Sequence, residues 1–402
     1  MSWKEIELGS AIRVKHGFAF KSEGFSDIGD FVVLTPGNFY EKGGFRIRPD
    51  KERYYVGEIP EGFVLHEGDV IVAMTEQADG LLGSSAWIPT SGKYLHNQRL
   101  GLIEITEPKT LNKRFLYHLF NSRPVRAQIS ASASGTKVRH TAPERIYRVK
   151  ALIPDVPAQE RIAESVENYD LLIENNRRRI HLLEQSARLL YKEWFVNLRF
   201  PGHEHVKVVD GVPKGWEKVP LSYICDDVRE TVRPNDIDPT TAYIGLEHIP
   251  RRTITLSEWG KAEDVTSNKF RFRQGDILFG RIRPYFHKVG FALTDGITSS
   301  DTIVIRPYDI DLYHLILMLV SSEHFVAVAS KTAKEGSKMP RADWKHLKTF
   351  AVTVPKTSLR EAFGDAMAPI VSQLKTLAFH SRKLSEAREL LLPRLMSGEI
   401  EV

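Results

Sequence analysis

Two long stretches of the chain place mostly apolar or small residues at alternating steps of four and three. The first runs through Ile162, Val166, Tyr169, Ile173, Asn176, Ile180, Leu183, Ala187, Leu190 and Trp194. Adding 201 to each number gives Phe363, Met367, Ile370, Leu374, Leu377, Ser381, Leu384, Arg388, Leu391 and Leu395. Such spacing over about five heptads is typical of a coiled-coil seam. It predicts long helices over residues 154–200 and 356–402, with Asn176 either setting the register or tolerated as a defect.

The chain repeats itself over half its length. Gly135, Lys137 and Pro154 recur as Gly336, Lys338 and Pro355 at the same offset of 201. Gly68–Asp69 and Gly83 pair with Gly275–Asp276 and Gly290 at an offset of 207, and Trp3 and Leu8 pair with Trp216 and Leu221 at 213. The drift indicates small insertions between two copies of one structural plan.

Each copy begins with a segment that favours β-structure. "GDVIVAMT" and "GDILFGRIRP" place a turn before short apolar runs rich in Val and Ile, which is typical of a strand that leaves a turn. "KRFLYHLFNS" and "LYHLILMLVSSEHFVAVAS" then favour core helices. We therefore predict an α+β protein with similar globular domains at 1–153 and 201–355, and with the two long helices paired antiparallel as a coiled coil. The internal repeat would make this a pseudo-twofold molecule.

Positive charge is concentrated in the second half. Residues 251–288 hold nine Lys or Arg against four acids, and residues 331–348 hold six against two, although the whole chain carries only +5. Clustering of this kind suits contact with phosphates, and the alternative is a solvated surface. Approximate twofold symmetry with diverged halves is what a DNA target with two different half-sites requires.

Composition narrows the class of protein further. The single cysteine, Cys225, excludes a disulfide framework and a multi-cysteine zinc site. "HEH" at 203–205 lacks a third ligand at metal spacing, so it is interpreted as a solvated loop and no metal site is expected. No run of 18 apolar residues or signal-peptide core occurs, which predicts a cytoplasmic protein without a membrane partner.

The helical segments resemble a known family. "IPDVPAQERIAESVENYDLLIENNRRRIHLLEQSARLLYKEWFVNL" is similar to the central conserved region of the DNA-specificity subunit of type I restriction–modification systems, and "SEARELLLPRLMSGEI" to the distal one. "GVPKGWEKVPL" resembles the entry to its second target-recognition domain, and "GFAFKSEGF" an early segment of such domains. The first copy departs from the pattern, because it has only "MSWKEIEL" in place of a Pro-x-Gly-Trp entry.

The resemblance implies that the chain is a non-catalytic subunit which reads a bipartite, asymmetric DNA target. In that family two methyltransferase subunits, and in some assemblies endonuclease or translocase subunits, bind the specificity subunit. Adenine N6 is methylated with S-adenosylmethionine that the methyltransferase holds, so no cofactor is expected in this chain. The chain itself contains no Asn/Asp-Pro-Pro-aromatic motif, no Gly-rich loop after a strand and no Walker A run.

Two other classes stay open at this point. A stand-alone DNA-binding regulator would need no methyltransferase. A nuclease with an unrecognised site would use scattered acids such as Asp226, Asp227 and Glu230, but no spacing selects them.

Candidate DNA-binding residues follow from charge and from side-chain chemistry. In the second half, Arg281 and Arg283 alternate in "GRIRP" and are expected to project from one strand face, where Arg can bind phosphate or guanine. Amides and short hydroxyls suit base edges, whereas loop lysines and arginines suit phosphates. The full set is Lys21, Asn97, Gln98, Arg99, Lys137, Arg139, Arg251, Arg252, Arg281, Arg283, Lys288, Ser300, Lys338 and Arg341. Solvated strand positions, folding loops and internal hydrogen bonds are the alternatives.

Overall fold

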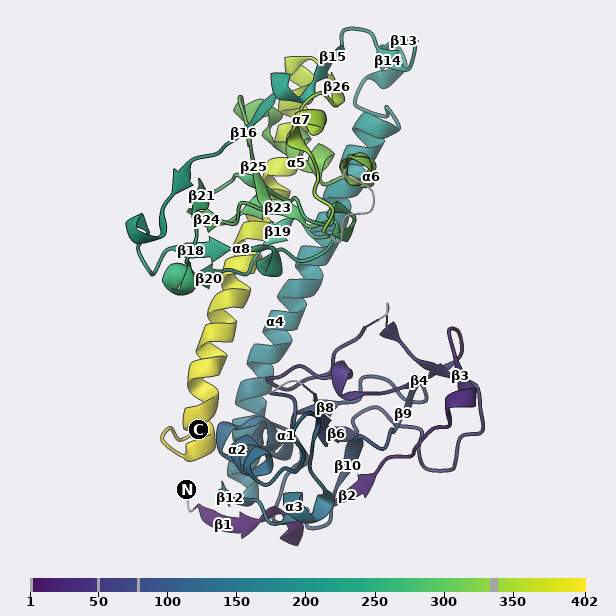
Figure 1. The fold of residues 1–402 in the computed structure, drawn as a ribbon, viewed down its shortest axis with the longest axis vertical. Helices are drawn as coiled ribbons and strands as arrows, with labels where there is room; N and C mark the ends of the chain where they lie inside the picture. Colours follow the sequence, from purple (N-terminus) through teal and green to yellow (C-terminus); the bar gives the residue numbers. More distant parts are fainter. Residues whose placement is uncertain (1–2, 49–50, 78–79, 333–338) are drawn as a thin grey trace. The chain divides into compact units, whose positions relative to one another are not determined.

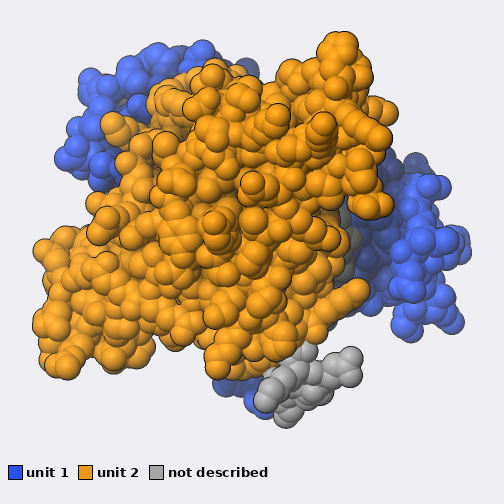
Figure 2. All heavy atoms as spheres, turned by 90° about the horizontal axis from the view of Figure 1, so that it is seen from above, with its two compact units in different colours: residues 1–170, 386–402 blue, residues 171–385 orange. Residues whose placement is uncertain are grey.

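The structure is a computed structural model that describes residues 3–48, 51–77, 80–332 and 339–402. It contains two compact units, one formed by residues 1–170 and 386–402 and the other by residues 171–385. These are called unit 1 and unit 2 below, and Figure 2 colours their residues.

The described residues of unit 1 form two four-stranded sheets, with the strand orders β2-β10-β6-β8 and β3-β5-β4-β9, and two strand pairs, β1-β12 and β7-β11. Its strands are β1 (Lys4–Glu7), β2 (Ile12–His16), β3 (Phe25–Ser26), β4 (Phe31–Val33), β5 (Tyr54–Tyr55), β6 (Val70–Ala73), β7 (Thr75–Glu76), β8 (Ser85–Trp87), β9 (Tyr94–Leu95), β10 (Leu100–Ile105), β11 (Arg139–His140) and β12 (Lys150–Ile153). The short helices are α1 (Lys113–Asn121), α2 (Arg123–Ala131) and α3 (Pro143–Tyr147).

In the part of unit 2 that the structure describes there are two five-stranded sheets, with the orders β16-β25-β22-β23-β19 and β17-β21-β24-β18-β20, and two strand pairs, β15-β26 and β13-β14. Its strands are β13 (Val208–Val209), β14 (Val212–Pro213), β15 (Glu217–Pro220), β16 (Cys225–Asp227), β17 (Thr231–Val232), β18 (Ala242–Ile244), β19 (Thr255–Leu256), β20 (Gly260–Lys261), β21 (Lys269–Phe272), β22 (Ile277–Gly280), β23 (Val289–Ala292), β24 (Gly296–Thr298), β25 (Thr302–Pro307) and β26 (Ala351–Val354). The short helices are α5 (Tyr313–Val320), α6 (Glu323–Lys331) and α7 (Trp344–Leu347).

Two long helices contribute to both units. Helix α4 (Val156–Tyr191) continues into a π-helical turn, Lys192–Val196, and α8 spans Thr357–Ser397 (Figure 1). Every predicted seam position on both helices is buried or half-buried, and most of those side chains pack into the cores of the units. Unlike α4, α8 continues through two internal prolines, Pro369 and Pro393, each of which removes one helical hydrogen bond.

The contacts show that the two helices run antiparallel in each unit. In unit 1, Arg161 of α4 donates to the carbonyl of Val402, and the later Asp170 pairs with the earlier Arg388. In unit 2, Asn176 lies 3.5 Å from His380, and the later Trp194 packs on the earlier Phe363 at 5.5 Å between ring centroids.

The predicted fold class is therefore confirmed: mixed helix and sheet, with a long helix between two sheet-rich regions. The predicted domain boundaries stay a prediction, because the two compact units divide both long helices near their middles.

The internal repeat extends to individual hydrogen bonds. Strand β1 pairs with β12, and β15 pairs with β26 in the same register, Lys4 opposite Ile153 and Glu217 opposite Val354. Asp69 accepts from the backbone N–H of His66 at 2.8 Å, and Asp276 does the same for Arg273 at 2.7 Å. The glycines before these acids, Gly68 and Gly275, both have positive φ, which a glycine adopts without strain. The copies thus share turns as well as strands.

One predicted equivalence is wrong. Ala73 donates to Ser84 in unit 1 and Gly280 donates to Lys288 in unit 2, so the hairpin loop is three residues shorter in the second copy. Gly83 therefore corresponds to His287 and not to Gly290. Both residues have positive φ, 78° and 52°, so the second copy places a histidine where the first has a glycine.

Candidate nucleic-acid interface

Most candidate DNA-binding residues gather on a backbone arrangement that the two units share. In unit 1 the N–H of Met74 donates to Arg99 at 3.0 Å, and its carbonyl accepts from Thr141 at 2.9 Å. In unit 2 the N–H of Arg281 donates to Asp301 at 2.8 Å, and its carbonyl accepts from Ala342 at 2.9 Å. We call this arrangement the three-segment frame. In unit 1 it consists of residues 74–76, 97–99 and 139–141, and in unit 2 of residues 281–283, 299–301 and 340–342.

The frame brings residues from distant parts of the sequence together. In unit 1 it carries Asn97, Gln98, Arg99 and Arg139, and in unit 2 it carries Arg281, Arg283, Ser300 and Arg341. By hydrogen-bond position Gln98 corresponds to Ser300 and Arg99 to Asp301, since Leu100 and Thr302 donate to Asn97 and Ser299 respectively. The amides Asn97 and Gln98 and the hydroxyl residue Ser300, which the sequence suggested for contact with base edges, thus lie in the same turn of the two copies.

In unit 2 the frame is continued by further basic residues. Arg251 lies over the ring of Phe286 at 3.9 Å, and Arg283 lies 5.8 Å from the same ring. The neighbouring Tyr285 is exposed. Cations beside aromatic rings suit nucleic acid, because the guanidinium meets phosphate or a base edge while the ring offers a stacking surface. We call Arg251, Arg252, Arg281, Arg283, Lys288 and Arg341 the basic cluster.

The basic cluster is a built structure and not a set of loose surface chains. Arg281 donates from Nε to the carbonyl of Ala342 at 3.0 Å, and Arg341 donates from Nε to Asp301 at 3.0 Å. Lys288 donates to the carbonyl of Leu246, and burial lowers the pKa of its amine. Positioned cations of this kind lose less side-chain entropy on binding an anion.

The expectation that Arg281 and Arg283 share a strand face is wrong. Strand β22 ends at Gly280, and Arg283 has a φ of 48°, in the left-handed region. The chain turns there because Pro284–Phe286 forms a short 3-10 helix. Three of the five described non-glycine residues with positive φ lie in or beside the basic cluster: Arg252, Arg283 and His287. Strained backbone held by its surroundings is frequent at functional sites.

In unit 1 the frame has the opposite charge at the matching position. Glu76 stands where unit 2 has Arg283, and its side chain is only 3% exposed. It accepts from the N–H groups of Leu81 at 3.0 Å and Leu82 at 2.8 Å, and from Arg139 at 3.0 Å. Arg139 also donates to the carbonyl of Ser130 at 2.6 Å. Arg139 is therefore a structural partner of Glu76 as well as a DNA candidate.

The other candidates lie beside the frame or outside it. Asn97 accepts from the N–H of Arg99 at 3.0 Å through its own side chain, whereas Gln98 and Arg99 are exposed at the tip of the turn. Lys21 and Lys137 are exposed in loops, and Lys338 lies outside the described residues. Which of these residues touch DNA stays a prediction.

Sequence reasoning missed several residues that shape this interface. Glu76 and Glu184 are buried acids, and Phe286 is the ring that two arginines share. A buried acid on a strand end or on a helix has the same sequence signal as a solvated one. The sequence signal available for this ring was the pair of aromatic residues between basic residues in "RPYFHK".

Neither a metal centre nor a membrane span is indicated. Within the described ranges no group of three or more His, Cys, Asp or Glu is placed to hold a metal ion. In the same ranges no single helix is both long and apolar enough to cross a membrane. One pair, Ile310–Val320 and Glu323–Lys331, meets the test only when joined, and it is bent by 67°.

Comparisons with known proteins agree with this architecture. Residues 1–185 match the family model described as Type I restriction modification DNA specificity domain. The chain is 31% identical to the type I restriction enzyme EcoBI specificity subunit of Escherichia coli over 69% of its own length and 60% of that protein. It is 24% identical to the EcoDI specificity subunit of the same species over 66% of its own length and 63% of that protein. The alignments thus cover less than two thirds of these relatives.

A solved structure shows the same fold. The crystal structure of the type I restriction–modification S subunit from M. genitalium superposes with a TM-score of 0.61, at 13% identity, over 98% of this chain and 96% of that one. At 13% identity the similarity shows a shared fold and nothing more. Because the superposition covers 98% of this chain, the shared fold includes both sheet-rich regions and both long helices.

Proposed function

Since residues 1–185 belong to the type I restriction modification DNA specificity family, we propose that this chain reads a bipartite, asymmetric DNA target for partner subunits. The observation that carries the proposal is the three-segment frame. It occurs once in each unit with the same hydrogen bonds, and in each unit it holds side chains that can contact phosphates or base edges.

The asymmetry of the target follows from the side chains on the frame. Unit 2 presents Arg281 and Arg283 where unit 1 has Met74 and Glu76. Arg281 and Arg283 can bind guanine or phosphate, whereas the buried Met74 and Glu76 offer DNA neither contact, so the two frames favour different sequences. Each unit therefore reads its own half-site.

Partner subunits supply the chemistry in this proposal. The chain is a non-catalytic specificity subunit that positions two adenine-N6 methyltransferase subunits, which hold S-adenosylmethionine, and in some assemblies endonuclease or translocase subunits. Exposed apolar residues on α4 and the turn after it support protein docking: Leu171, Leu172, Leu182, Leu189 and Val196. Leu182 and Leu189 are seven residues apart within α4, which places them on one stripe of the helix.

The test combines purification with motif mapping. The tagged chain is expressed with the methyltransferase of its own system, the complex is purified, and methylated adenines are mapped in the host DNA. We expect co-purification and one bipartite motif with unlike halves. A chain that binds a specific sequence without any methyltransferase would instead support a stand-alone regulator, and Mg²⁺-dependent cleavage by the chain alone would support a nuclease.

A further inference from the structure

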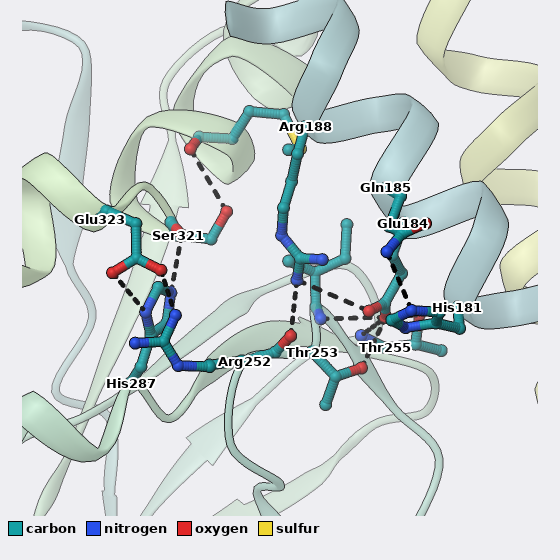
Figure 3. A network of polar contacts seen from close by, with 12 residues as sticks. His181, Glu184, Gln185, Arg188, Arg252, Thr253, Thr255, His287, Ser321 and Glu323 are labelled. Atoms are coloured by element: carbon teal, nitrogen blue, oxygen red, sulfur yellow. Dashed lines mark hydrogen bonds and ion pairs between the residues drawn. The ribbon is translucent and has the colours of Figure 1, made fainter.

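We propose that Glu184 and Arg188 of α4 are positioning residues for the DNA-reading surface of unit 2. The inference rests on the proposed function, because it concerns how the basic cluster is presented to DNA. Neither residue belongs to that cluster, and both lie on the long helix (Figure 3).

Glu184 is buried against the loop that precedes β19. Its side chain is 3% exposed, and a single oxygen, Oε1, accepts four hydrogen bonds. The donors are the Thr253 hydroxyl at 2.6 Å, the Ile254 N–H at 3.0 Å, the Thr255 N–H at 3.0 Å and the Thr255 hydroxyl at 2.8 Å. β19 is the last strand of its sheet, so these N–H groups face away from the sheet and need an acceptor.

Arg188 holds the same loop one helical turn further along. Its Nη2 lies 3.6 Å from Glu184 Oε2 and donates to the carbonyl of Arg252 at 2.8 Å. The two side chains therefore fix consecutive residues of the loop, from 252 to 255, to one face of α4. We call this pair the helix clamp.

The clamped loop leads directly into the basic cluster. The N–H of Arg252 donates to the carbonyl of His287 at 2.9 Å, and His287 ends the short helix that carries Phe286. Arg251, next to the clamped segment, lies over the Phe286 ring. Arg252 itself pairs with Glu323 at the start of α6, and His287 contacts the carbonyl of Ser321 at 2.8 Å. Figure 3 shows this continuous path from α4 to α6.

The positive φ values explain why such an anchor is needed. Arg252 and His287 have φ of 59° and 52°, and a non-glycine residue in this region costs about 1–2 kcal/mol. Without the clamp the loop would relax to ordinary backbone angles, and Arg251 would leave its place beside Phe286. The clamp thus fixes where the guanidinium groups stand relative to the helix, and it touches no DNA itself.

The test uses the full chain with its methyltransferase partner and four variants. Glu184→Ala removes the acceptor. Glu184→Gln keeps an oxygen acceptor for the loop, Thr253→Val removes a single donor, and Glu174→Ala is the matched control, an exposed acid on the same helix. Hydrogen exchange at residues 254 and 255 reports the clamp, and the methylated motif reports base discrimination in each half-site.

For Glu184→Ala we expect at least about tenfold faster exchange at 254 and 255, because both amides lose their acceptor. Base discrimination should fall about tenfold in the half-site that unit 2 reads, and the other half-site should not change. Glu184→Gln should retain most of the amide protection at 254 and 255 and most of the base discrimination. Thr253→Val should give a smaller loss of discrimination in the same half-site. Glu174→Ala should match the parent in both measurements.

Three results would overturn the inference. Faster exchange with unchanged discrimination would show that the loop is not positioned for reading. An equal loss in both half-sites would show general destabilisation, and unchanged exchange would show that no clamp exists. Absence of a bipartite motif for the parent chain would contradict the proposed function instead, and the exchange data would still report on the clamp.

Discussion

The three-segment frames of unit 1 and unit 2 have the same backbone hydrogen bonds but carry opposite charges at two matching positions, Glu76 against Arg283 and Arg99 against Asp301. In unit 1 the strand end carries Met74 and Glu76, and the facing turn carries Arg99. In unit 2 the strand end carries two arginines, and the matching turn position is Asp301. The backbone is thus retained while the chemistry of its side chains is exchanged.

The same backbone frame therefore presents different side chains in the two units, as the proposed reading of two different DNA half-sites requires. Each frame contains an acid paired with an arginine of the segment before the last short helix of its unit, Glu76 with Arg139 and Asp301 with Arg341, both at 3.0 Å. The acid lies on the strand end in one unit and on the turn in the other. The pair stabilises the frame in both cases, and it leaves a different segment available to carry the remaining cations.

The largest difference should appear on removal of the strand-end side chain. Glu76→Ala leaves Arg139 and the N–H groups of Leu81 and Leu82 without this acceptor, so we expect unit 1 to lose about 3 kcal/mol of stability. Arg283→Ala, at an exposed position, should cost unit 2 less than about 1 kcal/mol. Peptide-resolved hydrogen exchange in denaturant measures both. Equal losses of stability in the two units would contradict the assignment of Glu76 as a buried structural acid and of Arg283 as an exposed side chain.

The pH dependence of unit 1 should be the next largest effect. Burial lowers the pKa of His96 and of His118 to about 4, so both imidazoles are neutral in the folded protein. The unfolded chain takes up these protons near pH 6.5, so the stabilisation is complete above that pH and is lost as the pH falls towards 4. At pH 5 the loss should be about 2 kcal/mol for each histidine.

Variants separate this effect from general acid unfolding. His118→Leu should flatten the fall in unit 1 stability between pH 6.5 and 4.5, because it removes one of the two groups that bind a proton only in the unfolded chain. Its Nε2 has no hydrogen-bond partner among the described residues, so the substitution breaks no bond of that atom there. His66→Gln, at an exposed position, is the control and should leave the profile unchanged. A His118→Leu profile as steep as that of the parent would show that this histidine does not govern the pH response.

Arg283→Gly should separate stability from DNA contact in unit 2. Glycine adopts the φ of 48° without strain, so the folded state should gain about 1 kcal/mol. DNA affinity should fall, with the salt slope of log affinity reduced by about one if Arg283 contacts phosphate. If it contacts a base, preference at one position should fall about tenfold with the slope retained. Unchanged DNA binding would remove Arg283 from the interface.

The smallest effect concerns the polar seam residue of unit 2. Asn176 is 6% exposed and its Nδ2 lies 3.5 Å from His380 Nδ1, a long contact for a buried amide. Asn176→Leu should raise stability by about 0.5–1 kcal/mol, while Asn175→Leu at an exposed position should not. Thermal unfolding measures the gain, and a monodisperse product would identify Asn176 as a tolerated defect. Mixed assemblies would identify it as register-setting, and a clear loss would contradict both interpretations.

The sequence predicted the features that leave a local pattern of residues along the chain. The 4-3 seam located both long helices because burial along a helix leaves a periodic signal. Gly68–Asp69 and Gly275–Asp276 were matched correctly because glycine at positive φ followed by an acid forms a recognisable turn. The separate turns at 97–99 and 299–301 were also singled out, but their equivalence required hydrogen bonds that are not visible in the sequence.

Side-chain roles inside the loops could not be predicted in the same way. Gly83 was matched to Gly290 because both are glycines, whereas the three-residue difference in loop length makes His287 its counterpart. Arg281 and Arg283 alternate as strand residues do, yet the strand ends before them. Glu184 gives the same sequence signal as an exposed helix acid, and only the arrival of a loop from residues 252–255 makes it buried.

We propose that each unit reads its own half-site through its own frame. The most direct test of this proposal is an exchange of residues 217–345 for the corresponding segment of a related specificity subunit with a known target. The methylated motif of the hybrid is then compared with that of the parent. We expect that one half-site changes to that of the donor while the other half-site is retained. A change in both half-sites, or in neither, would contradict it.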